Sequence, residues 1–290
     1  MRKIATLAAC MLIIAACAQK KQKTAADNGQ PTTITWIEDK PGGNLQPCKL
    51  YPEVPDSLWN ALGLKEGVPS GMNCFLLKTE GKTILLDAGL GTPFSQLLPK
   101  LKEEGVTPEN LELIFITHLH PDHIGGLLKE GKVTFPKAHL YVNRVEAEAW
   151  QAMNGDNAKL AKAVLEAYKD RLRLFEAGDT LEGGVKSIAA YGHTPGHTVF
   201  QKDSILVIAD LIHGAALQFK HPEYCPSYDM DADAARQSRQ RILKYARENN
   251  LTMYGMHLPA PGYTEFLETY FYLIKSAKSS QHLPCRIVGG

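Results

Sequence analysis

The chain has 290 residues, of which 44% are hydrophobic and 22% charged, and its formal net charge is +1. This balance excludes a strongly basic surface of the kind that attracts nucleic acid without sequence preference. The length allows two domains and is sufficient to bury a substantial core. No internal repeat or low-complexity segment is visible.

The chain begins with the pattern of a secretory signal. A basic start, Arg2-Lys3, precedes the uncharged run 5–16, which is shorter than the roughly 20 residues of a membrane span. The sequence Ile14-Ala15-Ala16-Cys17 resembles a bacterial lipobox. We therefore predict a signal peptide over 1–16 and a lipidated Cys17, which would anchor the protein in the bacterial cell envelope, facing the periplasm or on the outer membrane. Ordinary cleavage near Cys17 is the alternative.

Residues 17–31 are polar and nearly free of hydrophobic side chains, which predicts a flexible tether. Loss of Arg2 and Lys3 with the signal would change the formal charge from +1 to −1. Residues 32–290 are predicted to form a single domain, because the candidate site residues lie far apart in the sequence and must converge on one site.

Strand patterns and helical patterns alternate along the rest of the chain. Runs rich in β-branched and apolar residues predict strands over 33–37, 72–77, 83–87, 111–116, 140–143, 187–191, 198–201 and 204–209. Helices are predicted over 94–104, 146–153, 159–168 and 234–248, the last capped by Asp231 or Asp233. This order predicts an α/β (α+β) fold with two sheets and helices outside them.

The densest group of metal-ligand side chains follows the predicted strand 111–116. Three imidazoles and a carboxylate fall within six positions: His118, His120, Asp122 and His123. Alternation along a strand places His118 and His120 on one face, and Pro121 suits the first position of a helical turn. Neutral imidazoles and carboxylates are ligands for cations such as zinc. A charged loop that holds histidines by chance is the alternative.

The pattern H-x-H-x-D-H resembles the signature of the metallo-β-lactamase superfamily. The resemblance implies a four-layer αββα sandwich, in which two mixed sheets are flanked by helices, and more metal ligands downstream. His193 lies in the loop Gly192-His193-Thr194-Pro195-Gly196-His197, Asp210 ends an apolar run, and His257 follows another. The resemblance implies two divalent ions, preferably zinc, one held by His118, His120 and His193, the other by Asp122, His123 and His257, with Asp210 shared.

Supporting roles are expected for two further residues, and three histidines have no special setting. His197 resembles a residue that contacts the metal ligands without binding metal itself. Asp87 is expected to orient a ligand imidazole through the ring nitrogen that faces away from the metal. An ordinary loop histidine and a structural acid at a strand end are the alternatives. The histidines left as surface or structural groups are His139, His221 and His282.

A narrower resemblance is to the methyl parathion hydrolase branch and its lactonase relatives. It rests on Asp210-Leu211-Ile212-His213, Gln218-Phe219, Asp229-x-Asp231 with Arg239, and the run 257–262. It implies a hydrolase in which a hydroxide between the two ions attacks a small ester-like substrate. A carboxylic ester or lactone is favoured over a phosphotriester.

Roles in that chemistry are expected for three residues. Asp122 or a metal-bound water would pass a proton to the leaving group, and Asp210 would bridge the ions. His213 stands where many lactonases have Tyr, and would contact a substrate oxygen or merely pack. Two alternatives belong to other classes: a lipid-anchored binding protein without catalysis, and an iron-loaded redox member of the superfamily.

Two groups of residues allow more than one interpretation. Cys48, Cys74, Cys225 and Cys285 can form two disulfides in an oxidising compartment, although Cys74 lies in an apolar run and suits a buried thiol. Aromatic and proline residues either line an apolar pocket or pack in the core: Trp150, Phe219, Tyr224 and the run 259–261.

Overall fold

The computed structural model describes residues 31–264. The predicted signal peptide, Cys17, the tether up to residue 30, His282 and Cys285 lie outside this range. Within it, no helix has the length and apolar character needed to cross a membrane. Cys48, Cys74 and Cys225 carry free thiols rather than disulfides with one another.

The first sheet contains six strands in the order β1-β4-β5-β6-β9-β10. Their bounds are Thr33–Glu38, Asn73–Thr79, Lys82–Leu86, Leu113–Phe115, His139–Asn143 and Leu172–Phe175. The pairs β1–β4 and β4–β5 are antiparallel, whereas β5, β6, β9 and β10 run parallel. The predicted strands over the first half of the chain are therefore confirmed, and β10 is an addition to them.

The second sheet also contains six strands, in the order β11-β12-β13-β14-β15-β16. They span Thr180–Leu181, Val185–Ala189, Thr198–Lys202, Ile205–Val207, Thr252–Tyr254 and Tyr263–Thr264. Only β14 and β15 pair in parallel; the other neighbours are antiparallel. Both sheets are mixed, as the sequence resemblance implied.

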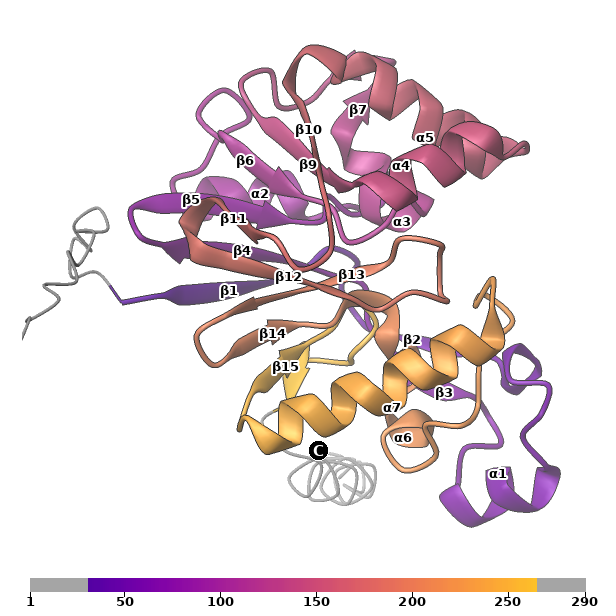
Figure 1. Cartoon of the computed structure of the whole chain (residues 1–290). Coiled ribbons are helices and arrows are strands. Elements are labelled where there is room, and N and C mark those ends of the chain that lie inside the picture. Colours follow the sequence, from indigo (N-terminus) through magenta and orange to yellow (C-terminus); the bar gives the residue numbers. More distant parts are fainter. Residues whose placement is uncertain (1–30, 265–290) are drawn as a thin grey trace, which may run out of the picture.

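The two sheets pack face to face, and helices cover their outer faces. Phe75, Phe115 and Phe200 belong to a cluster between the sheets, because alternate side chains of a strand point to opposite faces. Leu76 and Ile114, on the other face of the first sheet, pack against helices instead. The result is the four-layer αββα sandwich that the sequence resemblance implied (Figure 1).

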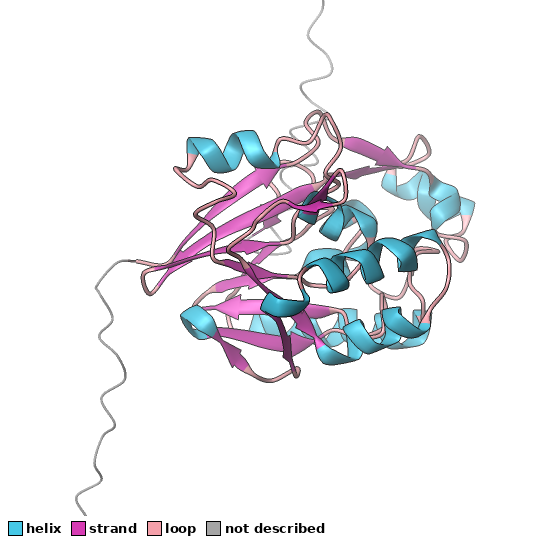
Figure 2. Cartoon of the chain, turned by 90° about the horizontal axis from the view of Figure 1, so that it is seen from above, coloured by secondary structure: helices cyan, strands magenta, loops and turns pink. Residues whose placement is uncertain are grey.

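Most helices lie over the first sheet, and one long helix lies against the second (Figures 1 and 2). The first group comprises α2 (Leu97–Glu103), α3 (Pro121–Ile124), α4 (Arg144–Ala152) and α5 (Asp156–Ala167). The long helix α7 (Ala232–Glu248) packs Ile242, Leu243 and Ala246 against the second sheet. Between the main elements lie short segments: η2 (Gly125–Leu127), β7 (Leu128–Lys129), β8 (Lys132–Val133), η3 (Lys169–Arg171), η4 (Glu182–Gly184), η5 (Ala209–Leu211) and α6 (Ala215–Gln218).

Residues 44–70 form structure that the sequence analysis did not predict. They contain β2 (Asn44–Gln46), η1 (Cys48–Leu50), α1 (Asp56–Leu62) and β3 (Val68–Ser70), with β2 and β3 paired. Tyr51, Trp59 and Val68 pack there with Leu217 of α6 in a separate small core. No clear periodicity marks this segment, because its apolar residues contact a distant part of the chain.

Helix α2 begins three residues after its predicted start at Phe94. The buried Asp39 carboxylate accepts hydrogen bonds from the backbone N–H groups of Leu90 and Leu97, each at 3.1 Å, and from the Ser95 hydroxyl. The segment before Leu97 therefore wraps around Asp39 instead of continuing the helix. A single buried acceptor has overridden the local helical pattern.

Candidate metal centre and its cavity

The histidine-rich segment leaves the first sheet at the end of β6 and turns into α3. His118 and His120 lie in the connecting loop, and Pro121 is the first residue of α3, as predicted. Asp122 and His123 follow within that short helix. His118 and His123 are fully buried, so this segment projects its side chains into the molecule.

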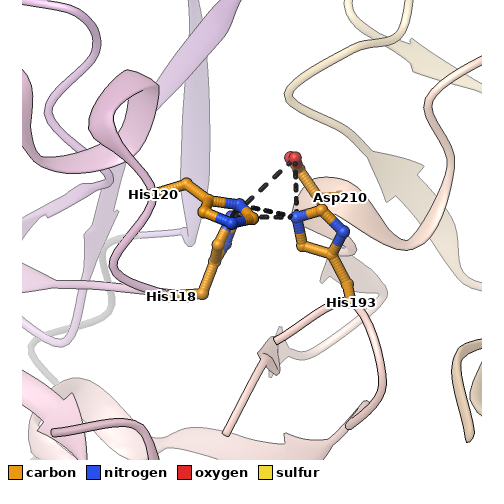
Figure 3. Close-up of side chains that lie close together, drawn as sticks. All are labelled: His118, His120, His193 and Asp210. Carbon is orange, nitrogen blue, oxygen red and sulfur yellow. Dashed lines mark hydrogen bonds and ion pairs between the residues drawn. The ribbon is translucent and has the colours of Figure 1, made fainter. Parts of the chain in front are cut away.

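Three of the predicted ligands converge with Asp210 in one cluster (Figure 3). His120 Nδ1 lies 3.0 Å from His118 Nε2 and 2.9 Å from His193 Nε2. The two Nε2 atoms of His118 and His193 are 3.2 Å apart. Asp210 Oδ2 lies 3.3 Å from His193 Nε2 and 3.8 Å from that of His118. Four donor atoms from three distant segments therefore face one point.

The spacing of these atoms fits a divalent cation. Tetrahedral zinc with Zn–N distances of 2.0–2.1 Å separates its ligand atoms by about 3.3 Å. The nitrogen pairs of His118, His120 and His193 lie close to that separation. Three imidazole nitrogens that all face one another cannot satisfy one another by hydrogen bonds alone, because a neutral ring carries only one N–H.

The second predicted group meets on the other side of Asp210 and consists of Asp122, His123, Asp210 and His257. His123 Nε2 lies 3.0 Å from Asp210 Oδ1, and His257 Nε2 lies 3.1 Å from Asp210 Oδ2. Asp122 Oδ2 is 3.6 Å from His257 and 3.9 Å from His123. Although buried, His123 Nε2 and Asp210 Oδ1 lack a hydrogen bond of proper geometry within residues 31–264. Such orphaned polar atoms fit a site for a second cation, with Asp210 common to both groups.

The charges of the cluster favour a cation at its centre. Burial, reinforced by the neighbouring His193, lowers the pKa of His120 to about 3. Burial opposes the charge on Asp210, but His257 and His123 hold the pKa of its carboxyl well below its usual value. Burial acts against a proton on His193, yet its hydrogen bonds to Asp210 and Asp229 raise its pKa to about 9. Asp210 and Asp229 therefore keep a proton on His193. A cation that binds to His193 would displace this proton.

The far nitrogens of three candidate ligands are each fixed by an acceptor, as is usual behind metal-bound histidines. Asp87 Oδ2 lies 2.7 Å from His123 Nδ1, as the sequence analysis expected. Asp229 Oδ1 lies 2.9 Å from His193 Nδ1, and the carbonyl oxygen of Gly71 lies 3.1 Å from His257 Nδ1.

The sequence analysis does not predict that Asp229 orients a ligand, although it includes Asp229 and Arg239 in the family resemblance. The Arg239 guanidinium donates to Asp229 Oδ2 at 2.9 Å. The Arg239–Asp229 ion pair connects α7 to the His193 ring. The sequence does not show that Arg239 and Asp229 are in contact.

His197 and His213 lie next to the cluster in different ways. The His197 ring lies 5.2 Å from that of His118 between centroids, and its Nδ1 is 3.0 Å from the carbonyl oxygen of Ala190, which places it behind the ligands. His213 Nε2 lies 3.2 Å from Asp210 Oδ2, and its ring stacks on His257. His139 and His221 lie outside both groups, beside Arg173 and Glu223 respectively.

A cavity of about 390 Å³ opens onto both groups of side chains. Its walls include apolar residues, Leu50, Met72, Leu90 and Tyr228, and the amides Asn44, Gln46 and Asn157. Asp122, Asp210, His120, His193, His213 and His257 form its polar floor. Among residues 31–264, no Lys or Arg lines this cavity.

Of the two alternatives for the aromatic and proline residues, the structure does not support a lining of this cavity. Trp150 and Phe219 are buried in the core, at 2% and 7% exposure, and Tyr224 packs beside the small core around Tyr51. The run 259–261 does not line the cavity either. Residues of the 44–50 segment line the cavity instead. No local pattern in the sequence distinguishes them.

The family model of the metallo-beta-lactamase superfamily matches residues 67–257. Among curated proteins, the exodeoxyribonuclease WalJ of Streptococcus pneumoniae is 36% identical over 128 residues, which cover 42% of this chain and 41% of that protein. The chain thus matches less than half the length of this relative. An N-acyl homoserine lactonase of Bacillus cereus is 26% identical over 210 residues, covering 63% of this chain and 79% of the lactonase.

Solved structures match over a larger part of the chain. The hydrolase AbOPH of the beta lactamase superfamily has a TM-score of 0.73 at 28% identity, covering 83% of this chain and 91% of that one. AidC, a dizinc quorum-quenching lactonase solved with the product N-hexnoyl-L-homoserine, has a TM-score of 0.73 at 26% identity, covering 80% and 89%. With its αββα layers, its His/Asp clusters and this family match, the chain belongs to the metallo-β-lactamase superfamily.

Proposed function

We propose that this protein is a dinuclear metal-dependent hydrolase that cleaves a small, uncharged carboxylic ester or lactone. The observation that carries the proposal is the pair of His/Asp groups sharing Asp210 at the floor of one cavity. His118, His120 and His193 would hold one cation, and Asp122, His123 and His257 the other. Two divalent cations, zinc being preferred, would supply a water nucleophile at neutral pH and polarise the scissile carbonyl.

The residues of the chain have distinct tasks in this proposal. Asp210 has oxygens on both groups and fixes their separation. Asp122 is the most exposed acid of the floor, with a side chain 23% accessible, so it can reach substrate and pass a proton to the leaving oxygen. His213 lines the cavity beside His257 and offers a hydrogen bond to a substrate oxygen.

The cavity lining favours an uncharged substrate. Leu50, Met72, Leu90 and Tyr228 provide apolar contacts, and the charged groups of the lining are acids and imidazoles. Residues 31–264 contribute no Lys or Arg to the lining, so among them a substrate phosphate or carboxylate would have no cationic side chain to pair with. The nuclease activity in the name of the streptococcal relative is therefore not favoured here, and a neutral phosphotriester ranks behind esters and lactones.

The test is hydrolysis by the purified protein of a panel of aryl esters, lactones and a phosphotriester. A strong chelator should abolish turnover, and zinc, manganese or cobalt should restore it. Asp210→Ala should lower kcat/KM by more than the roughly 10–100-fold typical of residues that only support ligands. His139→Ala, on the surface beside Arg173, should have no effect. Full turnover by the metal-stripped protein, or equal effects of the two variants, would refute the proposal.

We also propose that the mature protein, with residues 32–290 as a single domain, is anchored to the membrane through a lipid on Cys17. The support is the lipobox-like sequence and the polar tether that follows it. Radiolabelled fatty acid should be incorporated into the wild-type chain and not into Cys17→Ser. Equal labelling of both, or of neither, would exclude this anchor.

A further inference from the structure

A buried carboxylate that takes no part in either candidate metal group connects the segments that carry the first one. Glu146 lies in the first turn of α4 and is completely buried. From the sequence it resembles an ordinary acid at a helix N-terminus, where exposure is usual. Its side chain instead points to the loop of His118 and His120 and to the loop of His193.

Four donors converge on this carboxylate, two on each oxygen. Oε1 accepts from the backbone N–H of Leu119 at 2.9 Å and from the Trp150 indole N–H at 2.6 Å. Oε2 accepts from the Thr194 hydroxyl at 2.8 Å and from the backbone N–H of Gly196 at 2.7 Å. Leu119 separates His118 from His120 in the sequence, and Thr194 directly follows His193. One side chain therefore fixes the backbone beside three candidate ligands.

Two further contacts make this connection rigid. A Cβ on Gly196 would collide with the backbone N of Glu146 and would lie 2.6 Å from its Cβ, so the His193 loop packs directly against α4. Trp150, held by the same carboxylate, places its ring edge-on to the His120 ring, with centroids 5.5 Å apart. Helix α4 thus supports His120 from behind while Glu146 holds its backbone.

We propose that Glu146 is a positioning residue that pre-assembles the His118, His120 and His193 group for cation binding. This inference rests on the proposed function, because it assigns Glu146 a task at that metal group. The second group has other supports, Asp87 for His123 and the Gly71 carbonyl for His257. Loss of Glu146 should therefore weaken one cation site and spare the other.

The substitution Glu146→Gln tests this role with little change in volume. An amide places an NH₂ group, which can only donate, where a carboxylate oxygen accepts two hydrogen bonds. Either orientation of the amide leaves a backbone N–H, of Leu119 or Gly196, facing another donor. Both loops would then lose a fixed position relative to each other.

The measurement is zinc affinity, determined by competition with a chromophoric chelator. In a His257→Ala background only the first group keeps all its side chains, and Glu146→Gln should weaken zinc binding there by about 10–100-fold. In a His120→Ala background only the second group remains complete, and the same substitution should leave its affinity unchanged. Unchanged affinity at the first group, or an equal loss at both, would overturn the proposal.

Asp39→Asn provides the matched control for general destabilisation. Asp39 is also a fully buried carboxylate that accepts backbone and hydroxyl hydrogen bonds, but its partners Leu90, Leu97 and Ser95 are outside both metal groups. Asp39→Asn should lower thermal stability and leave zinc affinity at the first group intact. If it weakens that affinity as much as Glu146→Gln does, the positioning role is excluded.

Thr194→Val keeps the proposal testable if Glu146→Gln does not fold. It removes one of the four donors at nearly constant volume and should weaken zinc binding at the first group to a smaller, measurable extent; unchanged binding would count against the role. A wild-type chain that binds no cation would overturn the proposed function and this inference together. Two cations in the wild type, with Glu146→Gln unaffected, would overturn the inference alone.

Discussion

Arg239 is the largest side chain that the described part of the chain buries completely, and it lies behind the candidate metal centre. Its guanidinium donates to the carbonyl oxygens of Leu211, Pro222 and Tyr224 and to Asp229 Oδ2. Asp229 in turn fixes His193. Burying a carboxylate costs free energy unless a positive charge or hydrogen-bond donors compensate it. Arg239 supplies the positive charge for Asp229 while joining α7 to the loops around the cavity.

Replacing Arg239 by Ala should therefore reduce stability strongly. Its removal leaves Asp229 with only His193 as a charged partner and takes a donor from three carbonyl oxygens. We therefore expect a loss of about 3–5 kcal/mol in the free energy of unfolding. Urea unfolding followed by circular dichroism measures it. Arg144→Ala breaks an exposed pair with Glu176 and should cost about 0–1 kcal/mol. Similar losses for both variants would contradict the assigned role of Arg239.

At the scale of elements, the start of α7 is adjacent to the His193 loop. The backbone N–H of Asp231 donates to the Gly192 carbonyl at 2.9 Å, and that of Met230 donates to the His193 carbonyl at 3.1 Å. Gly192 has a φ of +125°, and a Cβ there would collide with the backbone of Ala235. The helix terminus thus determines where the loop can lie, and a glycine is required at the point of contact.

The structure resolves which acid caps this helix. The Asp231 side chain accepts a hydrogen bond from the Ala234 N–H at 3.0 Å, whereas Asp233 lies inside the first turn and pairs with Arg236 on the surface. Asp231→Ala should cost about 0.5–2 kcal/mol of stability, and Asp233→Ala should stay within about 0.5 kcal/mol. The denaturant midpoints of the two variants show which of them loses more stability. A larger loss of stability for Asp233→Ala would assign the cap to Asp233 instead.

At the scale of the whole molecule, polar contacts between the two sheets supplement the apolar layer between them. The Tyr141 hydroxyl on β9 donates to Glu182 Oε1, in η4 beside the second sheet, at 2.6 Å. Lys82 Nζ on β5 lies 3.2 Å from Glu182 Oε2. The Tyr141 hydrogen bond, more than the Lys82 charge, holds the pKa of Glu182 below its usual 4.5, while partial burial acts in the opposite direction.

This contact makes stability depend on pH in a defined direction. Because the pKa of Glu182 is lower in the folded state, its contribution is present above the unfolded value of 4.5 and is lost as pH falls through the folded value. The stability gap between wild type and Tyr141→Phe, both in chelator, should therefore shrink between about pH 6 and about pH 3. Unfolding free energies over this range test the trend.

Tyr168→Phe serves as the control for that experiment. The Tyr168 hydroxyl is also buried, but it donates to the Leu127 carbonyl oxygen at 3.2 Å, which does not titrate. Its stability gap relative to wild type should stay constant over the same range. A Tyr141→Phe gap that is equally constant would show that Glu182 does not carry the effect.

Local patterns predicted the sheets, the main helices and the first metal-ligand segment because each depends on neighbouring residues. Strand alternation and the spacing from His118 to His123 remain visible in a short window. His193, Asp210 and His257 were identified by resemblance, since a single His or Asp in a loop carries no local signal. In the structure they lie with the first segment in two adjoining groups that share Asp210.

The sequence by itself determined the pattern of strands and helices and the first segment of candidate metal ligands, from His118 to His123, because donor chemistry and side-chain periodicity are properties of the residues and their spacing. Only the tertiary structure decided what surrounds the metal ligands. In the sequence, Glu146 is an acid at the start of a predicted helix, and segment 44–50 has no periodic pattern. One is a buried acceptor for two loops, and the other forms a wall of the cavity, because burial and hydrogen-bond partners are set by contacts between residues that are far apart in the chain.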